Sequence, residues 1–421
     1  MERIRQLFKA LGPGILIACA AVGGSHLVWS TRAGAEYGWS LLGLVLLANF
    51  LKFPFFYFGQ HYTAVTGESL LSGYKRQGVF YLYVFIAINL LTGTINIAAV
   101  SMLTASLSIP FLGFLNLELT HLTILIALLL SGILFIGNYA ILDRLSKWII
   151  LILTAFTVLA VALAFFNQGP TLETALRPEV NPFKLASLAF IISLLGWMPA
   201  PIDLSTWSSL WMHSREAQTQ HKASPKEVAI DFSIGYGITT LLACLFLALG
   251  ALTLFETGAE IPQSGIQFSN QLIELYTSSI GSFAKPIIII AAFFTMLSTT
   301  LTCLDGYPRS LATSFLLLKT TSNKSHSIKK SHYSAMLIAY TVAASIILLL
   351  FVKNLISLLS FAAIVAFLSS PILAWFNLKV MTDSNVSREH QPAFWIKLTS
   401  YVGITFFTLI SCLFIYHHFI R

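Results

Sequence analysis

Charged residues are scarce in this chain. Asp, Glu, Lys and Arg make up 10% of its 421 residues, whereas hydrophobic residues make up 56%. A soluble chain of this length cannot bury that much apolar surface, so a soluble fold is excluded. The mean hydropathy of +0.79 agrees with this conclusion. The composition therefore indicates an integral membrane protein.

Cysteine is also rare, and its spacing excludes two kinds of site. The four cysteines lie far apart in apolar runs, at Cys19, Cys244, Cys303 and Cys412. This pattern provides neither a disulfide framework nor zinc ligands at the usual spacing, so buried thiols are expected. A cleavable signal is missing as well, because residues 1–14 form a short basic lead-in without a small-residue cleavage site.

Catalytic motifs are absent from the sequence. There is no G-x-S-x-G, H-E-x-x-H, P-loop or paired C-x-x-C pattern, and the scattered acidic residues form no credible catalytic pair. We therefore predict no enzyme activity, no cofactor and no obligate protein partner. The function must come from how the chain crosses the bilayer.

Apolar runs long enough to cross a bilayer need about 20 residues each. The sequence contains eleven such runs, and the connections between them are short, which predicts a single transporter domain over 1–421. An amphipathic segment around Gln267–Tyr276 is expected to form a short helix in the loop before the eighth run. The predicted spans are about 12–37, 39–66, 78–107, 119–140, 142–166, 183–212, 227–255, 282–317, 332–352, 354–381 and 394–419.

The basic residues predict the orientation of these spans, because cytoplasmic loops carry an excess of Lys and Arg. With the N-terminus in the cytoplasm, 18 of the 25 basic residues fall in cytoplasmic segments, five fall outside, and Arg32 and Lys52 lie within spans. The distribution predicts a plasma (bacterial inner) membrane protein with its C-terminus outside. It also explains the net charge of +8 without nucleic acid. The five outer residues are Arg177, Lys184, Lys285, Lys353 and Arg421.

Two of the predicted spans are interrupted. In span one, Gly23, Gly24 and Ser25 break an apolar run, and span six (IISLLGWMPAPIDLSTWSSL) is broken by Gly196, Pro199 and Pro201. Broken helices at corresponding places of two five-helix halves are typical of inverted-repeat secondary transporters. Unwound backbone is tolerated in a bilayer only where it lines a cavity or a site. The alternative interpretation is a pair of ordinary kinks, and a channel is the rival class.

Several short motifs resemble the NRAMP metal-transporter family. They are GPG at Gly12–Gly14, RAGAEYG at Arg32–Gly38, AVTGESL at the end of span two, and SSL at Ser208–Leu210. The resemblance covers spans one to ten in order and length. It implies an all-α LeuT-type fold, a 5+5 inverted repeat (spans one to five, about 12–166, and six to ten, about 183–381) with one extra helix, span eleven.

The metal chemistry of that family is not preserved at the matching positions. The Asp-Pro-Gly-Asn motif of its first span falls on Gly23–His26, and the Met-Pro-His motif of its sixth span falls on Ala200–Ile202. A further histidine corresponds to Trp207, and the Asp and Glu linked to proton movement fall on Gly93 and Asn96. We therefore expect no transition-metal site, because the carboxylate, thioether and imidazole ligands are gone. The resemblance is to a divergent branch with another substrate.

The altered site favours a small oxyanion. A half-helix that begins in span one offers free backbone N–H groups and a partial positive charge, which suit an anion. Ser25 and His26 add donors, and bicarbonate is the leading candidate, with nitrate, formate or a small carboxylate as alternatives. The predicted substrate-binding residues are Gly23, Gly24, Ser25, His26, Trp197, Ala200, Pro201 and Asp203.

Other roles stay open for several of these residues. His26 is either a substrate ligand or a packed, hydrogen-bonded histidine, and Asp203 is either a helix cap or an ion ligand. Arg32 is as well placed to pair with Glu36 as to touch substrate. The roles of Lys52 and His61 are unresolved.

A sodium site is implied by the resemblance, because LeuT-type folds build one from the unwound first span and hydroxyls of the eighth. Here the residues would be Ala20 and Gly23 with Ser298, Thr299 and Thr302. The alternative is that these hydroxyls bond back to helix carbonyls. Asp305 and Arg309, four residues apart, predict a structural ion pair.

These observations together predict a secondary transporter of a small anion, with bicarbonate as the leading candidate and Na⁺ as the driving ion. The competing prediction is a divalent-cation transporter for Mn²⁺ or Mg²⁺ that uses Asp203 and backbone carbonyls.

Overall fold

The computed structural model describes residues 10, 12–136, 139–167, 181–255, 262, 264–320, 328–351 and 354–420. These residues form helices joined by turns and loops, without a strand among them. Every predicted span overlaps a single helix or, in spans one and six, a series of shorter helices. Residues 137, 138 and 352, which fall in predicted spans four and nine, lie outside the described part.

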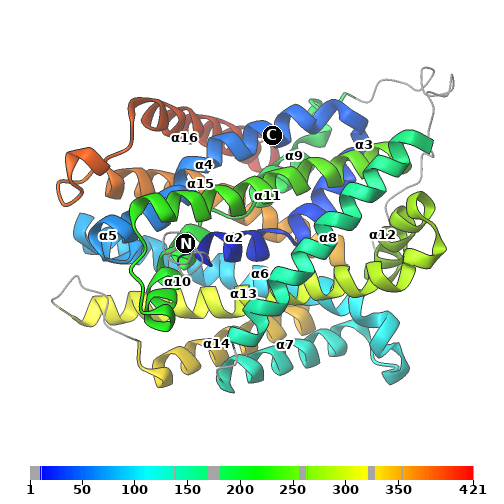
Figure 1. Ribbon diagram of the computed structural model, residues 1–421, viewed down its shortest axis with the longest axis horizontal. Helices are drawn as coiled ribbons and strands as arrows, with labels where there is room; N and C mark the ends of the chain where they lie inside the picture. Colours follow the sequence, from blue (N-terminus) through cyan, green and yellow to red (C-terminus); the bar gives the residue numbers. More distant parts are fainter. Residues whose placement is uncertain are drawn as a thin grey trace, which may run out of the picture.

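The unbroken spans are long single helices, most of which run side by side along the longest axis of the molecule (Figure 1). They are α4 (Leu42–Thr66), α6 (Val79–Leu112), α7 (Leu119–Ile136), α8 (Tyr139–Asn167), α11 (Pro225–Thr253), α13 (Lys285–Lys319), α14 (Lys330–Phe351), α15 (Leu355–Met381) and α16 (Phe394–Ile415).

Spans one and six are broken where the sequence predicts it. Span one consists of α2 (Pro13–Ala21), a π-helical segment η1 (Ser25–Ser30) and α3 (Thr31–Tyr37). Span six consists of α9 (Leu188–Trp197) and α10 (Leu204–Thr219), separated by the proline-containing link. Since proline lacks an N–H and glycine is a poor helix former, both links interrupt the helical hydrogen-bond ladder.

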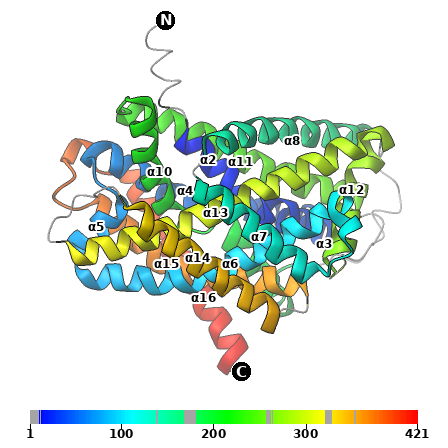
Figure 2. The same cartoon turned by 90° about the horizontal axis from the view of Figure 1, so that it is seen from below.

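Two shorter helices lie at opposite ends of the bundle (Figures 1 and 2). The segment around Gln267–Tyr276 forms α12 (Gly265–Ile280), which confirms that prediction. Helix α5 (Leu70–Gln77) was not predicted, although Ser69 caps it by accepting a hydrogen bond from the backbone N–H of Ser72 at 3.2 Å. It links spans two and three.

The packing joins the two halves of the chain. The third helices of the halves, α6 and α13, pack against each other, and α11 packs against both parts of span one. Helix α16 lies outside this arrangement, against α4 and α15. The Asp231 carboxylate on α11 accepts hydrogen bonds from the backbone N–H groups of Gly12 (3.1 Å) and Gly14 (2.5 Å), which anchors the start of α2. The GPG motif therefore lies where the start of α2 is hydrogen-bonded to α11.

The outer surface is apolar, as a bilayer requires. Large side chains such as Phe80, Phe114, Ile136 and Phe394 are 71–81% exposed, which is unfavourable in water but favourable in hydrocarbon. Eight stretches of the described residues are long and apolar enough to cross a membrane. The breaks shorten the helices of spans one and six, and α8 qualifies as a shorter apolar stretch, Ile150–Phe166. The chain is an integral membrane protein.

The orientation of the spans stays a prediction. Several basic residues in the charge count lie outside the described part of the chain, and the side chains of Arg144 and Lys147 are not described either. The undescribed residues are Arg3, Arg5, Lys9, Arg177, Lys324, Lys353 and Arg421.

Candidate functional site

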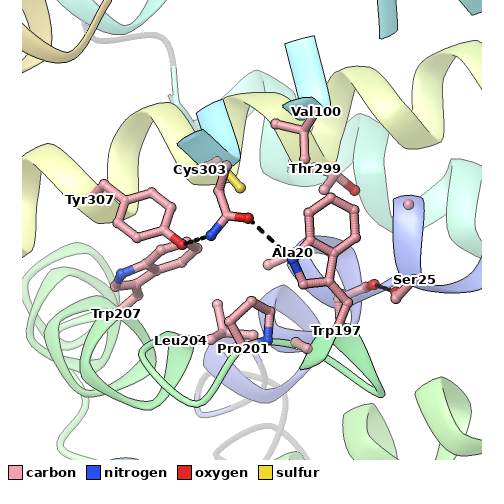
Figure 3. A pocket seen from close by; sticks show the side chains of 14 residues that line it. Ala20, Ser25, Val100, Trp197, Pro201, Leu204, Trp207, Thr299, Cys303 and Tyr307 are labelled. Carbon is pink, nitrogen blue, oxygen red and sulfur yellow. Dashed lines mark hydrogen bonds between the residues drawn. The ribbon is translucent and has the colours of Figure 1, made fainter. Parts of the chain in front are cut away.

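A cavity of about 40 Å³ lies where the two broken spans meet α6 and α13. Ala20, Ala21, Gly24 and Ser25 of span one form one part of its wall, and span six contributes another (Figure 3). None of its lining side chains carries a charge at neutral pH. The remaining lining residues are Asn96, Val100, Trp197, Ala200, Pro201, Leu204, Trp207, Thr299, Cys303 and Tyr307.

A chain of hydrogen bonds fixes the polar wall of this cavity. The indole N–H of Trp197 donates to Asn96 Oδ1 at 3.1 Å, and Asn96 Nδ2 donates to the Tyr307 hydroxyl at 2.7 Å (Figure 3). Tyr307 in turn interacts electrostatically with the Asp203 carboxylate, which accepts a hydrogen bond from Thr92 Oγ1 at 3.2 Å. Because every link joins two different helices, the polar groups are held in place before any substrate arrives.

The break in span one exposes both ends of the backbone ladder. On the carbonyl side, Thr299 Oγ1 lies 3.1 Å from Cys19 O and 3.0 Å from Val22 O, and Ser25 Oγ donates to Ala21 O at 2.5 Å. On the amide side, no acceptor within the described chain meets the N–H groups of Gly24 and Ser25. Both residues also line the cavity.

Close approach explains why glycine occupies the break. A Cβ at Gly23 would lie 2.7 Å from Thr299 Oγ1, and a Cβ at Gly24 would lie 2.5 Å from Cζ3 of Trp197. The two glycines thus allow span one to touch α13 on one side and α9 on the other.

Most of the predicted substrate-binding residues are brought together at the cavity. Gly24, Ser25, Trp197, Ala200 and Pro201 line it. Gly23, His26 and Asp203 are not among its lining residues. Their predicted direct contact with substrate has no support in this geometry.

His26 is held inside the protein by both ring nitrogens. Nε2 lies 2.9 Å from Thr239 O on α11, and Nδ1 lies 2.6 Å from Ser25 Oγ. The side chain is fully buried, and its ring meets Phe246 edge-on. This arrangement favours the packed, hydrogen-bonded histidine. The substrate-ligand role would require His26 to break a bond with α11.

We therefore expect His26→Ala to act on stability. The substitution removes two hydrogen bonds and leaves a cavity beside Phe246, so the free energy of unfolding should fall by about 2 kcal/mol. Thermal unfolding in detergent would measure this loss. His332→Ala is the matched control, because His332 is exposed and its removal should change stability by less than about 0.5 kcal/mol. Unchanged stability together with lost transport would instead support direct substrate contact.

Asp203 lies at the start of α10, as a cap residue would, but its side chain makes no capping hydrogen bond. It is 2% exposed, and its Oδ1 has no partner among the described residues. The predicted capping bond is therefore wrong. The carboxylate faces the tyrosine and threonine of the polar chain instead.

Of the residues predicted to bind sodium, Thr299 lies against the unwound part of span one. Thr299 meets the carbonyls of Cys19 and Val22, each one residue before the predicted Ala20 and Gly23. No hydrogen bond to Ala20 O is found within the described chain, and Ala20 lines the cavity. Thr302 bonds back to Thr299 O at 2.8 Å, as the alternative interpretation expects.

Residues left unresolved by the sequence are now placed. Arg32 pairs with Glu36 at 2.6 Å, and His61 Nδ1 lies 2.9 Å from the Tyr57 hydroxyl. Lys52 is fully buried against span six. Sequence reasoning also missed Cys303 and Tyr307 at the cavity, although both stand in the polar stretch of span eight that was singled out for sodium.

The positions of the lost proton-linked acids are filled differently. Asn96 lines the cavity and makes two side-chain hydrogen bonds. A Cβ at Gly93 would lie 2.7 Å from the Tyr307 ring, so an acidic side chain has no room there. Within the described residues, no group of three or more His, Cys, Asp or Glu side chains could hold a metal ion.

The chain is similar to proteins of a known family. Residues 14–417 match the family described as "Natural resistance-associated macrophage protein-like". The chain belongs to this family. An uncharacterised protein of Pasteurella multocida is 37% identical over 405 residues, 96% of this chain and 92% of that one. A divalent metal cation transporter of Listeria monocytogenes is 24% identical over 319 residues, 71% of this chain and 66% of that one.

Solved structures confirm the LeuT-type fold of this NRAMP-family chain. The manganese transporter of Eremococcus coleocola matches with a TM-score of 0.67 and 13% identity, over 97% of this chain and 86% of that one. The structure of MhsT with L-phenylalanine matches with a TM-score of 0.58 and 15% identity, over 94% and 98%. The chain is therefore an integral membrane protein of a transporter family.

Proposed function

We propose that this NRAMP-family protein is a secondary transporter of a small polyatomic anion, with bicarbonate as the leading candidate and Na⁺ as the coupling ion. The observation that carries the proposal is the break in span one. At this break Gly24 and Ser25, whose backbone N–H groups meet no acceptor in the described chain, line an uncharged cavity from which the metal-binding side chains of the family are missing.

Size and polarity support an anion. The cavity has a volume of about 40 Å³. One water molecule needs roughly 10–15 Å³, so the cavity has room for about three water-sized groups. A planar oxyanion fits that space, and the amides of Gly24 and Ser25 suit its oxygens. Donor groups held in a low-dielectric site bind anions more strongly than donors in water do.

The sodium proposal is supported by oxygens gathered beside the same break. Thr299 Oγ1 has a single proton yet lies within 3.2 Å of three carbonyls, those of Cys19, Val22 and Thr295. It can donate to only one of them at a time. A cation coordinated by Thr299 Oγ1 and the carbonyls of span one would satisfy the others, and Ala20 O is near enough in sequence to join.

A divalent-cation transporter is the second candidate, because relatives carry that name. It would use Asp203, whose Oδ1 has no partner in the described chain, together with backbone carbonyls. Against it stands the absence of any carboxylate among the residues that line the cavity. Dehydrating a doubly charged ion without anionic oxygen is costly.

The proposed setting is the bacterial inner membrane, with the N-terminus in the cytoplasm and the C-terminus outside. The bilayer and the solute are the only partners that the proposal needs. Alternating access would expose the cavity to one side and then the other, as the two broken helices move with their packing partners.

Uptake into proteoliposomes tests the proposed function. Labelled bicarbonate, formate and nitrate are compared with Mn²⁺ and Mg²⁺, each with and without an inward Na⁺ gradient. An alkaline medium keeps permeant CO₂ low. We expect saturable, Na⁺-dependent anion uptake and no saturable metal uptake. Mn²⁺ or Mg²⁺ uptake that Asp203→Asn abolishes would overturn the anion proposal in favour of the second candidate.

Replacing one hydroxyl should separate sodium coupling from folding. Thr299→Val keeps the shape of the side chain but removes the oxygen that faces Cys19 O and Val22 O. We expect it to weaken Na⁺-dependent anion uptake about tenfold, which corresponds to about 1.4 kcal/mol of coupling. The measurement is the Na⁺ concentration that gives half-maximal uptake.

Thr302→Val is the matched control for this experiment. Its hydroxyl bonds to the backbone of its own helix, so the substitution should leave the Na⁺ dependence unchanged. Equal effects of the two variants, or uptake that is the same in choline medium, would remove sodium from the mechanism.

A further inference from the structure

Lys52 is a lysine placed entirely inside the membrane domain. It lies on α4, and its side chain is 0% exposed. Its ammonium donates to three backbone carbonyls of span six: Leu195 O at 2.7 Å, Gly196 O at 2.9 Å and Ala200 O at 3.0 Å. An ammonium has three N–H donors, and all three are used.

These three carbonyls form a cation site by their own geometry. Leu195 and Gly196 belong to the last turn of α9, where unpaired carbonyls concentrate the negative end of the helix dipole. Ala200 lies within the break, and its carbonyl accepts from the same ammonium. Converging carbonyl oxygens are what proteins use to replace the hydration shell of a monovalent cation.

The opposite end of the same break carries the opposite charge. Asp203 lies at the start of α10, where a negative charge suits the helix dipole, and it interacts electrostatically with Lys52. Lys52 of span two and Asp203 of span six therefore place opposite charges at the two ends of the break in span six. The carbonyls at the break of span one are met by Thr299 and Ser25 hydroxyls, which carry no charge.

We propose that the carbonyl cluster of Leu195, Gly196 and Ala200 is a monovalent-cation site that the Lys52 ammonium occupies permanently. Each broken helix offers one cluster of C-terminal carbonyls. In span six the cation is built into the chain, so only the cluster in span one is open to an ion from solution. Lys52 is a positioning residue, since Ala200 both receives its hydrogen bond and lines the substrate cavity.

Removal of the tethered cation should open this site to small amines. Lys52→Ala deletes three methylenes and the ammonium beyond Cβ and leaves three buried carbonyls unpaired. Its thermal midpoint in detergent should fall on the order of 10 °C, because an uncompensated buried cluster is costly. n-Propylammonium, which matches the deleted atoms, should restore at least half of the loss. Wild-type protein should not respond.

Two further variants keep the test decisive. Lys52→Met fills the same space without a charge, so propylammonium should not stabilise it. Lys379→Ala removes a lysine that contacts the Tyr81 hydroxyl and ring instead of a carbonyl cluster, and it should not respond either. If Lys52→Ala cannot be purified alone, recovery of monodisperse protein only in propylammonium gives the same support. Equal responses of all variants, or none by Lys52→Ala, would overturn the proposal.

A second consequence rests on the proposed function. With one open cation site and one anion site, transport should carry one Na⁺ with one monovalent anion and move no net charge. Anion uptake should therefore not change when a valinomycin-imposed K⁺ potential is applied. Absent uptake would refute the proposed function and leave the amine test standing. Uptake that changes with the potential would mean that transport moves net charge. It would overturn the one-to-one ratio of Na⁺ to anion that follows from a cation site filled by Lys52, but it would not contradict sodium coupling.

Discussion

Gly24→Ala is expected to reduce anion uptake by about tenfold to 100-fold. The added methyl group would lie 2.5 Å from Cζ3 and 3.1 Å from Cε3 of Trp197. That ring cannot turn away freely, because its N–H is bonded to Asn96, which is bonded to Tyr307. Overpacking of this kind costs about 1–3 kcal/mol. Here the strain falls on the wall of the cavity, so affinity should decrease with it.

Gly43→Ala is the matched control for this substitution. Gly43 lies in α4, and a Cβ there meets nothing within 4 Å, so uptake should stay within about twofold of wild type. Initial uptake rates, normalised to the amount of reconstituted protein, measure both. If Gly24→Ala transports normally, the cavity beside Trp197 is not the substrate site.

The broken spans could be predicted because their cause is local. Glycine and proline interrupt a helix wherever they occur, so Gly23, Gly24 and Pro201 mark the breaks without any knowledge of the fold. The residues of the two breaks that line the cavity could therefore be predicted from the breaks alone. The resemblance to the NRAMP family added Asn96, which lines the cavity at the place of a lost acid.

Side-chain directions near the break could not be predicted in the same way. The segment Ser25–Ser30 is π-helical, so each turn holds an extra residue and the ordinary 3.6-residue periodicity fails there. His26 consequently faces Thr239 on α11 instead of the cavity. The carbonyls that meet Thr299, those of Cys19 and Val22, each lie one residue before those predicted.

Lys52 was unresolved because its partners are backbone atoms. A sequence records which side chains can pair with a lysine, but not which carbonyls a break leaves free. Those carbonyls lie about 140 residues away, and only packing of α4 against α9 brings them to Lys52. Helix α5 was missed for a different reason, since eight residues give too little periodicity to distinguish a short helix from a loop.

Asp305→Ala is expected to lower the free energy of unfolding by about 3–5 kcal/mol. Asp305 is 1% exposed, and its ion pair with Arg309, at 2.6 Å, confirms the predicted pairing. The carboxylate also accepts hydrogen bonds from the Trp211 indole and the Tyr333 hydroxyl, both at 2.9 Å. It therefore joins α10, α13 and α14. The substitution removes the buried carboxylate that these three helices share.

Glu36→Ala provides the contrast that isolates burial as the cause. The Arg32–Glu36 pair has the same four-residue spacing and the same 2.6 Å separation, but its carboxylate side chain is 31% exposed. Water can replace the lost partner, so the loss should be about 0.5 kcal/mol. Thermal or denaturant unfolding of both variants in detergent measures the difference. Because α10 carries the lining residues Leu204 and Trp207, Asp305→Ala should also weaken substrate binding, whereas Glu36→Ala should not. Similar losses of stability in the two variants would mean that Asp305 is only one more helix-surface ion pair and does not fix α10 against the cavity.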